Sequence, residues 1–204
     1  MNFGAIKPHQ LDALREISNI GMGHAATAMS QLIGSQIDLK VPRVTVSPIV
    51  EVPEIVGGAE SIIAGVYLQL YGDARGNVLL SFPRASVIQL LGLLLREENV
   101  DKGGVLSETA ASALKEIGNI LAGAYMSAMG DLLSLTLIPG VPAVAFDMAG
   151  AIIDYILIDL GSVGDLALVI ETEFFGKPEV TGHFFLLPDP ASLEVMLEAG
   201  NLLP

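Results

Sequence analysis

The sequence of 204 residues contains no cysteine and few basic residues. Without a thiol, a disulfide scaffold, a cysteine nucleophile and a thiolate metal site are all excluded, and we expect a reducing, cytoplasmic setting. Ten Lys and Arg residues stand against 23 Asp and Glu residues, which gives a net charge of −13. This balance argues against a nucleic-acid partner, because a phosphate backbone needs a basic face.

The sequence also has no hydrophobic run of the length that a membrane-spanning helix requires. The longest apolar stretches, Val87 to Leu95 and Ile152 to Ile158, are interrupted by Gln89 or Asp154 and fall short of about 20 residues. Yet 51% of the residues are hydrophobic and only 16% are charged, so most of the chain must be buried in a core. We therefore expect one non-membrane domain over residues 1–204 and no disordered tail.

Apolar residues recur at helical spacing in two long segments, residues 9–34 and 108–133, and predict two amphipathic helices. Runs rich in β-branched residues predict strands, and the segment from Gly72 to Gly76 has the composition of a hairpin turn. The order helix, strand, hairpin, helix occurs twice. It predicts an α+β fold, internally duplicated, in which a largely antiparallel sheet carries the two long pseudo-symmetric helices on one face. The predicted strands are 37–53, 62–71, 77–82, 141–146, 167–175 and 182–187, and the shorter helices are 83–95, 149–160 and 190–199.

The duplication can be counted in the long helices. A shift of 100 residues aligns Leu11 to Leu32 with Ala111 to Leu132, and 10 of these 22 pairs are identical. One or two identities would be expected by chance at ordinary residue frequencies of about 5–10%. We interpret the chain as a single domain of two fused repeats, about residues 8–96 and 106–200, that complete one core together.

Polar residues are repeated on one face of both helices, opposite the apolar stripe. A solvated face has no packing reason to keep Glu and Asn at one spacing, and Asn is a mediocre helix former. A glycine on that face costs about 1 kcal/mol relative to alanine, and its physical use is close approach by another molecule. We predict two equivalent docking or reaction faces, composed of Asp12, Glu16, Asn19 and Gly23 on the first helix and Ser112, Glu116, Asn119 and Gly123 on the second.

The spacing of these residues resembles the motif of a known family. Asp or Ser, three residues, Glu, two residues, Asn, twenty-two residues and Pro is the pattern of the CheC/CheX/FliY phosphatases of chemotaxis. Two complete copies without an added switch-binding domain are similar to the CheC type of member. The copies are Asp12, Glu16, Asn19 and Pro42, then Ser112, Glu116, Asn119 and Pro142.

The resemblance implies hydrolysis of the aspartyl phosphate of a CheY-type response regulator, which brings its own divalent metal, expected to be Mg²⁺. No cofactor is expected in this chain. Asn19 and Asn119 would orient the attacking water, because a carboxamide both donates and accepts hydrogen bonds. Glu16 and Glu116 would contact a cation beside the phosphorylation site of the regulator.

The remaining motif positions have supporting roles in this reading. Asp12 and Ser112 would support or cap the interaction, and Pro42 and Pro142 would shape the following strand. The two copies differ where Ser112 replaces Asp12, so the faces can differ in rate or affinity. His24 is expected to be packed at the border of the buried side.

Three further readings concern the rest of the chain. The predicted helix 149–160 has no counterpart of equal length in the first half and either covers the core or binds a second partner. The resemblance implies the receptor deamidase CheD as that partner, with Asp147 in its interface. The acids Asp147, Asp154, Asp159, Glu171 and Glu173 are read as solvated faces rather than a metal cluster. The alternative function is a non-catalytic flagellar-switch or adaptor module that binds the regulator.

Overall fold

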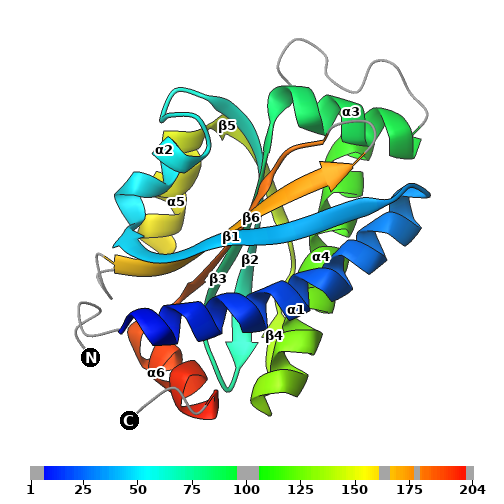
Figure 1. Ribbon diagram of the computed structural model, residues 1–204. Helices are drawn as coiled ribbons and strands as arrows, with labels where there is room; N and C mark the ends of the chain where they lie inside the picture. The colour runs from blue at the N-terminus through cyan, green and yellow to red at the C-terminus, as the bar shows by residue number, and fades with distance from the viewer. Residues whose placement is uncertain (1–6, 96–105, 161–165, 177–179, 201–204) are drawn as a thin grey trace.

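The computed structural model describes residues 7–95, 106–160, 166–176 and 180–200 (Figure 1). Its two longest helices are α1, Pro8–Ile33, and α4, Glu108–Leu133, each of 26 residues. Helix α1 begins with proline at its first position and ends at Gly34, whose φ of 72° suits glycine. Helix α4 is capped by Ser107, whose Oγ accepts a hydrogen bond from Ala110 N at 3.1 Å. Both helices match the predicted ranges closely.

The strands form antiparallel pairs throughout the described part of the chain. One sheet has the order β4-β2-β3-β7, with β5 also paired to β2, and a two-stranded ribbon joins β1 to β6. Strand β6 also runs beside β7. The strands are β1 Ile37–Pro48, β2 Ile62–Gly72, β3 Gly76–Pro83, β4 Leu137–Pro139, β5 Ala143–Met148, β6 Leu166–Gly176 and β7 His183–Pro188.

Alternate residues of the central strands face two different cores. Val66 and Leu80 belong to the larger core, which contains the buried residues of α1 and α4 together with α3, Arg84–Leu95, and α6, Pro190–Ala199. Ile63 and Leu79 point to the other face, where α2, Val52–Ile55, and α5, Ala149–Leu160, pack together. The α+β prediction, with both long helices on one face of a largely antiparallel sheet, is confirmed.

Strand pairing connects the two halves of the chain. The first strand of each half pairs with a strand of the other half: β1 pairs with β6, and β4 and β5 pair with β2. Strands β3 and β7 meet between them. Both halves therefore contribute to one larger core.

Helices α1 and α4 pack closely against each other. The hydroxyl of the fully buried Tyr125 donates to Ser18 Oγ at 3.1 Å, and burial raises the pKa of that phenol far above its usual value. A Cβ at Gly21 would lie 2.8 Å from the Tyr125 ring, so glycine is needed at this contact. The faces that carry the motif residues thus belong to two helices that pack tightly against each other.

Two local features differ from the predicted ranges. The strand predicted over 37–53 ends at Pro48 and is followed by a 3₁₀ turn, η2, Ile49–Glu51, and by the short helix α2. The strand predicted over 141–146 is observed as β5, Ala143–Met148, and a short strand that was not predicted, β4, precedes it at Leu137–Pro139. Proline-rich and glycine-containing segments carry weak periodicity, so their division depends on pairing partners. Among the described helices, none combines the length and the apolar character needed to cross a bilayer.

Candidate functional site

The predicted motif residues lie on the outer faces of α1 and α4, away from the larger core. On α1, Asp12, Glu16 and Gly23 are exposed, and Asn19 is half-buried. On α4, Ser112, Glu116 and Asn119 are exposed, and Gly123 is half-buried. Each helix therefore presents its own carboxylate and carboxamide on a rigid scaffold.

The two repeated glycines stand in open space. Apart from the adjacent backbone of its own helix, a Cβ built on Gly23 or on Gly123 would have no atom of the described residues within 4 Å. Neither glycine is therefore required by packing inside this chain, in contrast to Gly21 and to Gly118, where a Cβ would lie 2.5 Å from Val66 Cγ1. The open glycines fit the predicted docking faces.

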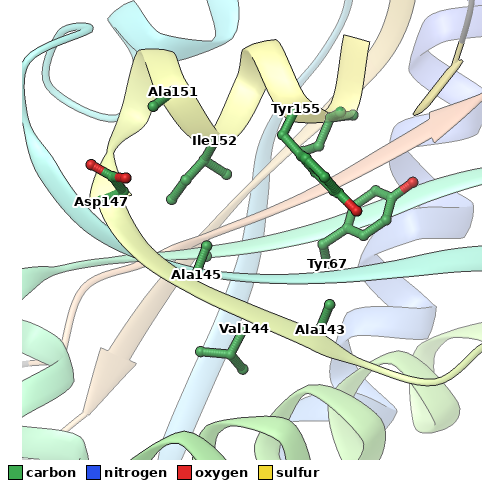
Figure 2. Close-up of a pocket in the computed structure, with 10 residues that line it drawn as sticks. Tyr67, Ala143, Val144, Ala145, Asp147, Ala151, Ile152 and Tyr155 are labelled. Carbon is green, nitrogen blue, oxygen red and sulfur yellow. The ribbon is translucent and has the colours of Figure 1, made fainter. Parts of the chain in front are cut away.

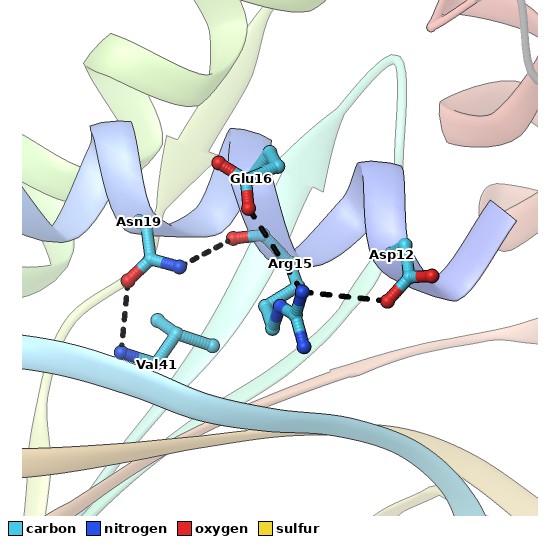
Figure 3. A network of polar contacts seen from close by, with 5 residues as sticks. All are labelled: Asp12, Arg15, Glu16, Asn19 and Val41. Atoms are coloured by element: carbon cyan, nitrogen blue, oxygen red, sulfur yellow. Dashed lines mark hydrogen bonds and ion pairs between the residues drawn. The ribbon is translucent and has the colours of Figure 1, made fainter. Parts of the chain in front are cut away.

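On the α1 face, the carboxamide of Asn19 is held at both ends (Figure 3). Its Nδ2 donates to the carbonyl oxygen of Arg15 at 3.0 Å, and its Oδ1 accepts from Val41 N at 3.0 Å. The pairing of β1 with β6 shifts register between Lys40 and Arg43, so this bond fixes the strand at an irregularity that includes Pro42. The twenty-two residues between Asn19 and Pro42 thus bring the motif proline next to the residue that Asn19 holds.

The charged groups of the α1 face are also paired with each other. Arg15 Nη2 lies 3.4 Å from Asp12 Oδ1 and 4.0 Å from Glu16 Oε1 (Figure 3). Arg15 was not among the predicted site residues, although the shift of 100 aligns it with another cation, Lys115. That repeated positive charge was the signal that could have found it.

The α4 face has no comparable contacts within the described residues. Among the residues that the structure describes, the Asn119 side chain makes no hydrogen bond, and neither Glu116 nor Lys115 forms an ion pair. Val141, the counterpart of Val41, is 91% exposed, whereas Val41 is 3% exposed. Pro142 lies between β4 and β5, outside either strand. Within the described part of the chain, a motif residue therefore contacts the proline segment on α1 only.

His24 does not lie where the helical wheel placed it. The residue is exposed on α1, so the prediction of a packed histidine is wrong. The reason is that α4 covers the side of α1 that carries Gly21, whereas His24 lies beyond the covered side and stays in solvent.

A separate pocket lies on the other side of the sheet, between β2, β5 and α5 (Figure 2). Its volume is about 420 Å³, and Asp147, Ile152, Tyr155 and Tyr67 are among its lining residues. The two tyrosine rings meet edge-on, with centroids 6.3 Å apart. Asp147 Oδ1 accepts from Met148 N at 2.8 Å, immediately before α5 begins.

The other acidic candidates do not form a cluster with metal-ligand geometry among the residues that the structure describes. Glu171 is half-buried and lies 3.9 Å from Arg43; burial raises its pKa, and the Arg43 charge partly offsets that rise. Asp154 and Glu173 are exposed, as predicted, and the side chain of Asp159 falls outside the described residues. Burial lowers the pKa of His183, while the Glu173 charge acts in the opposite direction.

Known structures share the architecture described above. FliY of Thermotoga maritima superposes with a TM-score of 0.79 at 21% identity, over 97% of this chain and 98% of that one. The FliM middle domain of H. pylori superposes with a TM-score of 0.71 at 13% identity, over 95% and 99% of the two chains. This chain thus has a fold that FliY and the FliM middle domain share.

Sequence comparison narrows the class. The model of the CheC-like family matches residues 10–46 and 110–145, which contain the motif residues of both long helices. The CheY-P phosphatase CheC of Bacillus subtilis is 38% identical over 201 residues, 97% of this chain and 96% of that protein. This chain belongs to the CheC-like family, as the repeated motif predicted.

Proposed function

We propose that this chain is a protein phosphatase that hydrolyses the aspartyl phosphate of a CheY-type response regulator in chemotaxis. The observation that carries the proposal is the pair of Glu and Asn motifs on the outer faces of α1 and α4, where Glu16, Glu116 and Asn119 are exposed and Asn19 is half-buried. The curated relative with 38% identity is a CheY-P phosphatase, which supports the same activity here. We also propose a cytoplasmic location, where such a regulator would be met.

The chemistry asked of this chain is limited. The regulator would bring the acyl phosphate and a divalent metal, Mg²⁺, that neutralises phosphoryl charge. An exposed carboxamide on a rigid helix can hold a water in line with the leaving oxygen, and it needs no change of protonation to do so. Glu16 or Glu116 would contact a cation on the regulator and fix its register, and the open sites at Gly23 and Gly123 would permit close approach.

Phosphate release from a phosphorylated regulator tests the proposal. We expect the double variant Asn19→Ala, Asn119→Ala to lose most of the stimulated release. Gln89→Ala, which removes an exposed carboxamide from α3, is the matched control and should keep the parental rate. A parental rate in the double variant would contradict the role of the asparagines.

The same assay separates the alternative function, a flagellar-switch or adaptor module. The fold shared with a FliM middle domain makes this a reasonable second candidate. An adaptor would bind the phosphorylated regulator without accelerating phosphate release, and the asparagine substitutions would leave that rate unchanged.

We further propose that the face around α5 binds the deamidase CheD. The pocket beside Asp147 and Tyr155 supports this proposal, as does the exposure of Tyr155 at 62% and Ile158 at 79%. Such apolar side chains next to a carboxylate suit a protein partner better than solvent.

Calorimetric titration with CheD tests this face. Tyr155→Ala should weaken binding at least tenfold, and Asp147→Asn, which keeps an oxygen acceptor for Met148 N, should weaken it by the loss of charge alone. Asp154→Asn on the same helix is the charge control. Unchanged affinity in both test variants would place the interface elsewhere.

A further inference from the structure

We infer that the two motif faces are not equivalent: the α4 face carries out the reaction, and Asn19 on α1 is a positioning residue that fixes strand β1. The inference rests on the proposed phosphatase function. It assigns that function to Asn119 and Glu116 rather than to both helices.

The contacts of Asn19 leave its carboxamide little freedom to hold a water. Its amine faces a carbonyl oxygen and its oxygen faces an N–H group, so the orientation of the amide is fixed by its partners (Figure 3). One N–H group and one lone pair of the carboxamide remain unused, but to turn them toward a docked phosphoryl group Asn19 would have to release Val41 N, which belongs to a residue only 3% exposed. An unpaired buried N–H group is costly, so this release is opposed.

The carboxylate of the α1 face is engaged as well. Glu16 shares Arg15 with Asp12, so the guanidinium already serves two carboxylates of its own helix. On α4, Ser112 replaces Asp12, and Glu116 has no ion-pair partner among the described residues. Glu116 is therefore available to a cation of the regulator without competition from a neighbouring arginine.

The path of the chain explains why α4 lacks the contact that holds Asn19. In the second half the strand divides at Gly140, whose N–H donates to Gln69 O at 2.7 Å. A Cβ at Gly140 would lie 2.8 Å from the exposed Tyr71 ring and 3.1 Å from Gln69 O, so a larger residue on this route along β2 would have to displace the ring. The next residue, Val141, is turned into solvent, and its amide does not meet Asn119.

The first half has a lysine at the corresponding position, and its strand stays continuous. Lys40 pairs with Glu173 across the ribbon, and its Nζ lies 5.2 Å from the centroid of the Phe175 ring. The adjacent Val41 is buried in the larger core, and its N–H group donates to Asn19 Oδ1. The different strand paths thus explain why Asn19 is hydrogen-bonded to the strand that follows its helix, whereas the Asn119 side chain has no such partner among the described residues.

Single substitutions compared in the full chain test the assignment. We expect Asn119→Ala to lower the rate of phosphate release from the phosphorylated regulator at least tenfold, and Asn19→Ala to lower it less than threefold. Asn19→Ala should instead speed hydrogen exchange at the Val41 amide and lower the melting temperature, and Asn119→Ala should do neither. A loss of rate in Asn19→Ala equal to that in Asn119→Ala would overturn the inference.

A second readout does not depend on turnover. In side-chain amide NMR spectra, titration with a beryllofluoride-activated regulator should shift the Asn119 amide and leave the Asn19 amide in place. If the parent protein fails to accelerate phosphate release, the proposed function fails, and these shifts alone decide which face the regulator contacts. Equal shifts of both amides would contradict the inference.

Discussion

The glycines of the two long helices have two different surroundings: some lie in tight internal contacts, and others face open space. At Gly21 and Gly118 a Cβ would enter the space of Tyr125 or Val66, so these glycines allow internal packing. At Gly23 and Gly123 a Cβ would meet nothing. Since glycine weakens a helix, the second pair fits the proposed docking of a partner outside the chain.

Alanine substitutions at these positions should separate the two uses. Gly123→Ala should raise the free energy of unfolding by about 0.5–1 kcal/mol through helix propensity, and weaken binding of the activated regulator. Gly118→Ala should lower the free energy of unfolding by about 1–3 kcal/mol, because Val66 must move. Urea denaturation measures the change in stability, and a binding titration measures the affinity for the regulator. Tighter binding by Gly123→Ala would contradict a docking role for Gly123.

A second residue-scale effect concerns His183, which stacks on Phe185 and carries a pKa lowered by burial. The unfolded chain binds a proton near the usual histidine pKa of 6.5, whereas the folded chain resists it. The contribution of His183 to stability is therefore present above that value and is lost as the pH falls through it.

Acidification from pH 7.5 to 5.5 should accordingly lower the melting temperature, and His183→Gln should reduce this dependence. His24→Gln, at an exposed position, is the matched control. Thermal melts at several pH values measure the slopes. An unchanged slope in His183→Gln would assign the pH dependence to other groups.

At the scale of elements, the caps and the neighbours of α1 and α4 determine how the motif is presented. The two helices have the same length, but α4 begins with a serine cap, while α1 begins at a proline. The strands that follow them differ more: β1 is continuous with a register shift, and its counterpart is divided into β4 and β5. The presentation of the motif thus depends on elements outside it.

The cap of α4 can be tested directly. Ser107→Ala should destabilise the protein by about 1 kcal/mol, because Ala110 N loses its acceptor. Thr109→Ala, an exposed change in the same turn, is the control and should have a smaller effect. Chemical denaturation gives both values, and equal effects would mean that the serine side chain does not stabilise the helix start.

At the scale of the whole molecule, strand pairing makes the two halves dependent on each other. Strand β1 pairs with β6 of the second half, and β2 pairs with β4 and β5 of the second half. The larger core contains residues of both halves. A half alone would expose unpaired strand edges and half of that core.

Separate halves, divided near residue 100, should therefore fail to unfold cooperatively on their own and should regain a cooperative transition when mixed. Circular dichroism during urea titration measures this. A cooperative transition in the isolated first half would show that its core suffices, and would contradict the shared-core account.

Most of the helices and strands, and the repeated motif, could be predicted from the sequence. Apolar periodicity located both long helices within about one residue, and the repeated spacing of Glu, Asn and Pro identified the family. These features are local or repeat at a fixed interval, so a linear reading detects them. The interpretation as two fused repeats also came from that reading and stays a prediction.

The contacts of each motif residue could not be predicted from the sequence, because they depend on segments that the fold brings together. Asn19 and Asn119 are indistinguishable in the aligned repeats, yet one holds Val41 N and the other makes no hydrogen bond within the described chain. The difference arises from the route of the strand more than twenty residues away, where Gly140 follows β2 past Tyr71. Helical periodicity shows which face a residue occupies, but contacts between distant segments depend on how the whole chain packs.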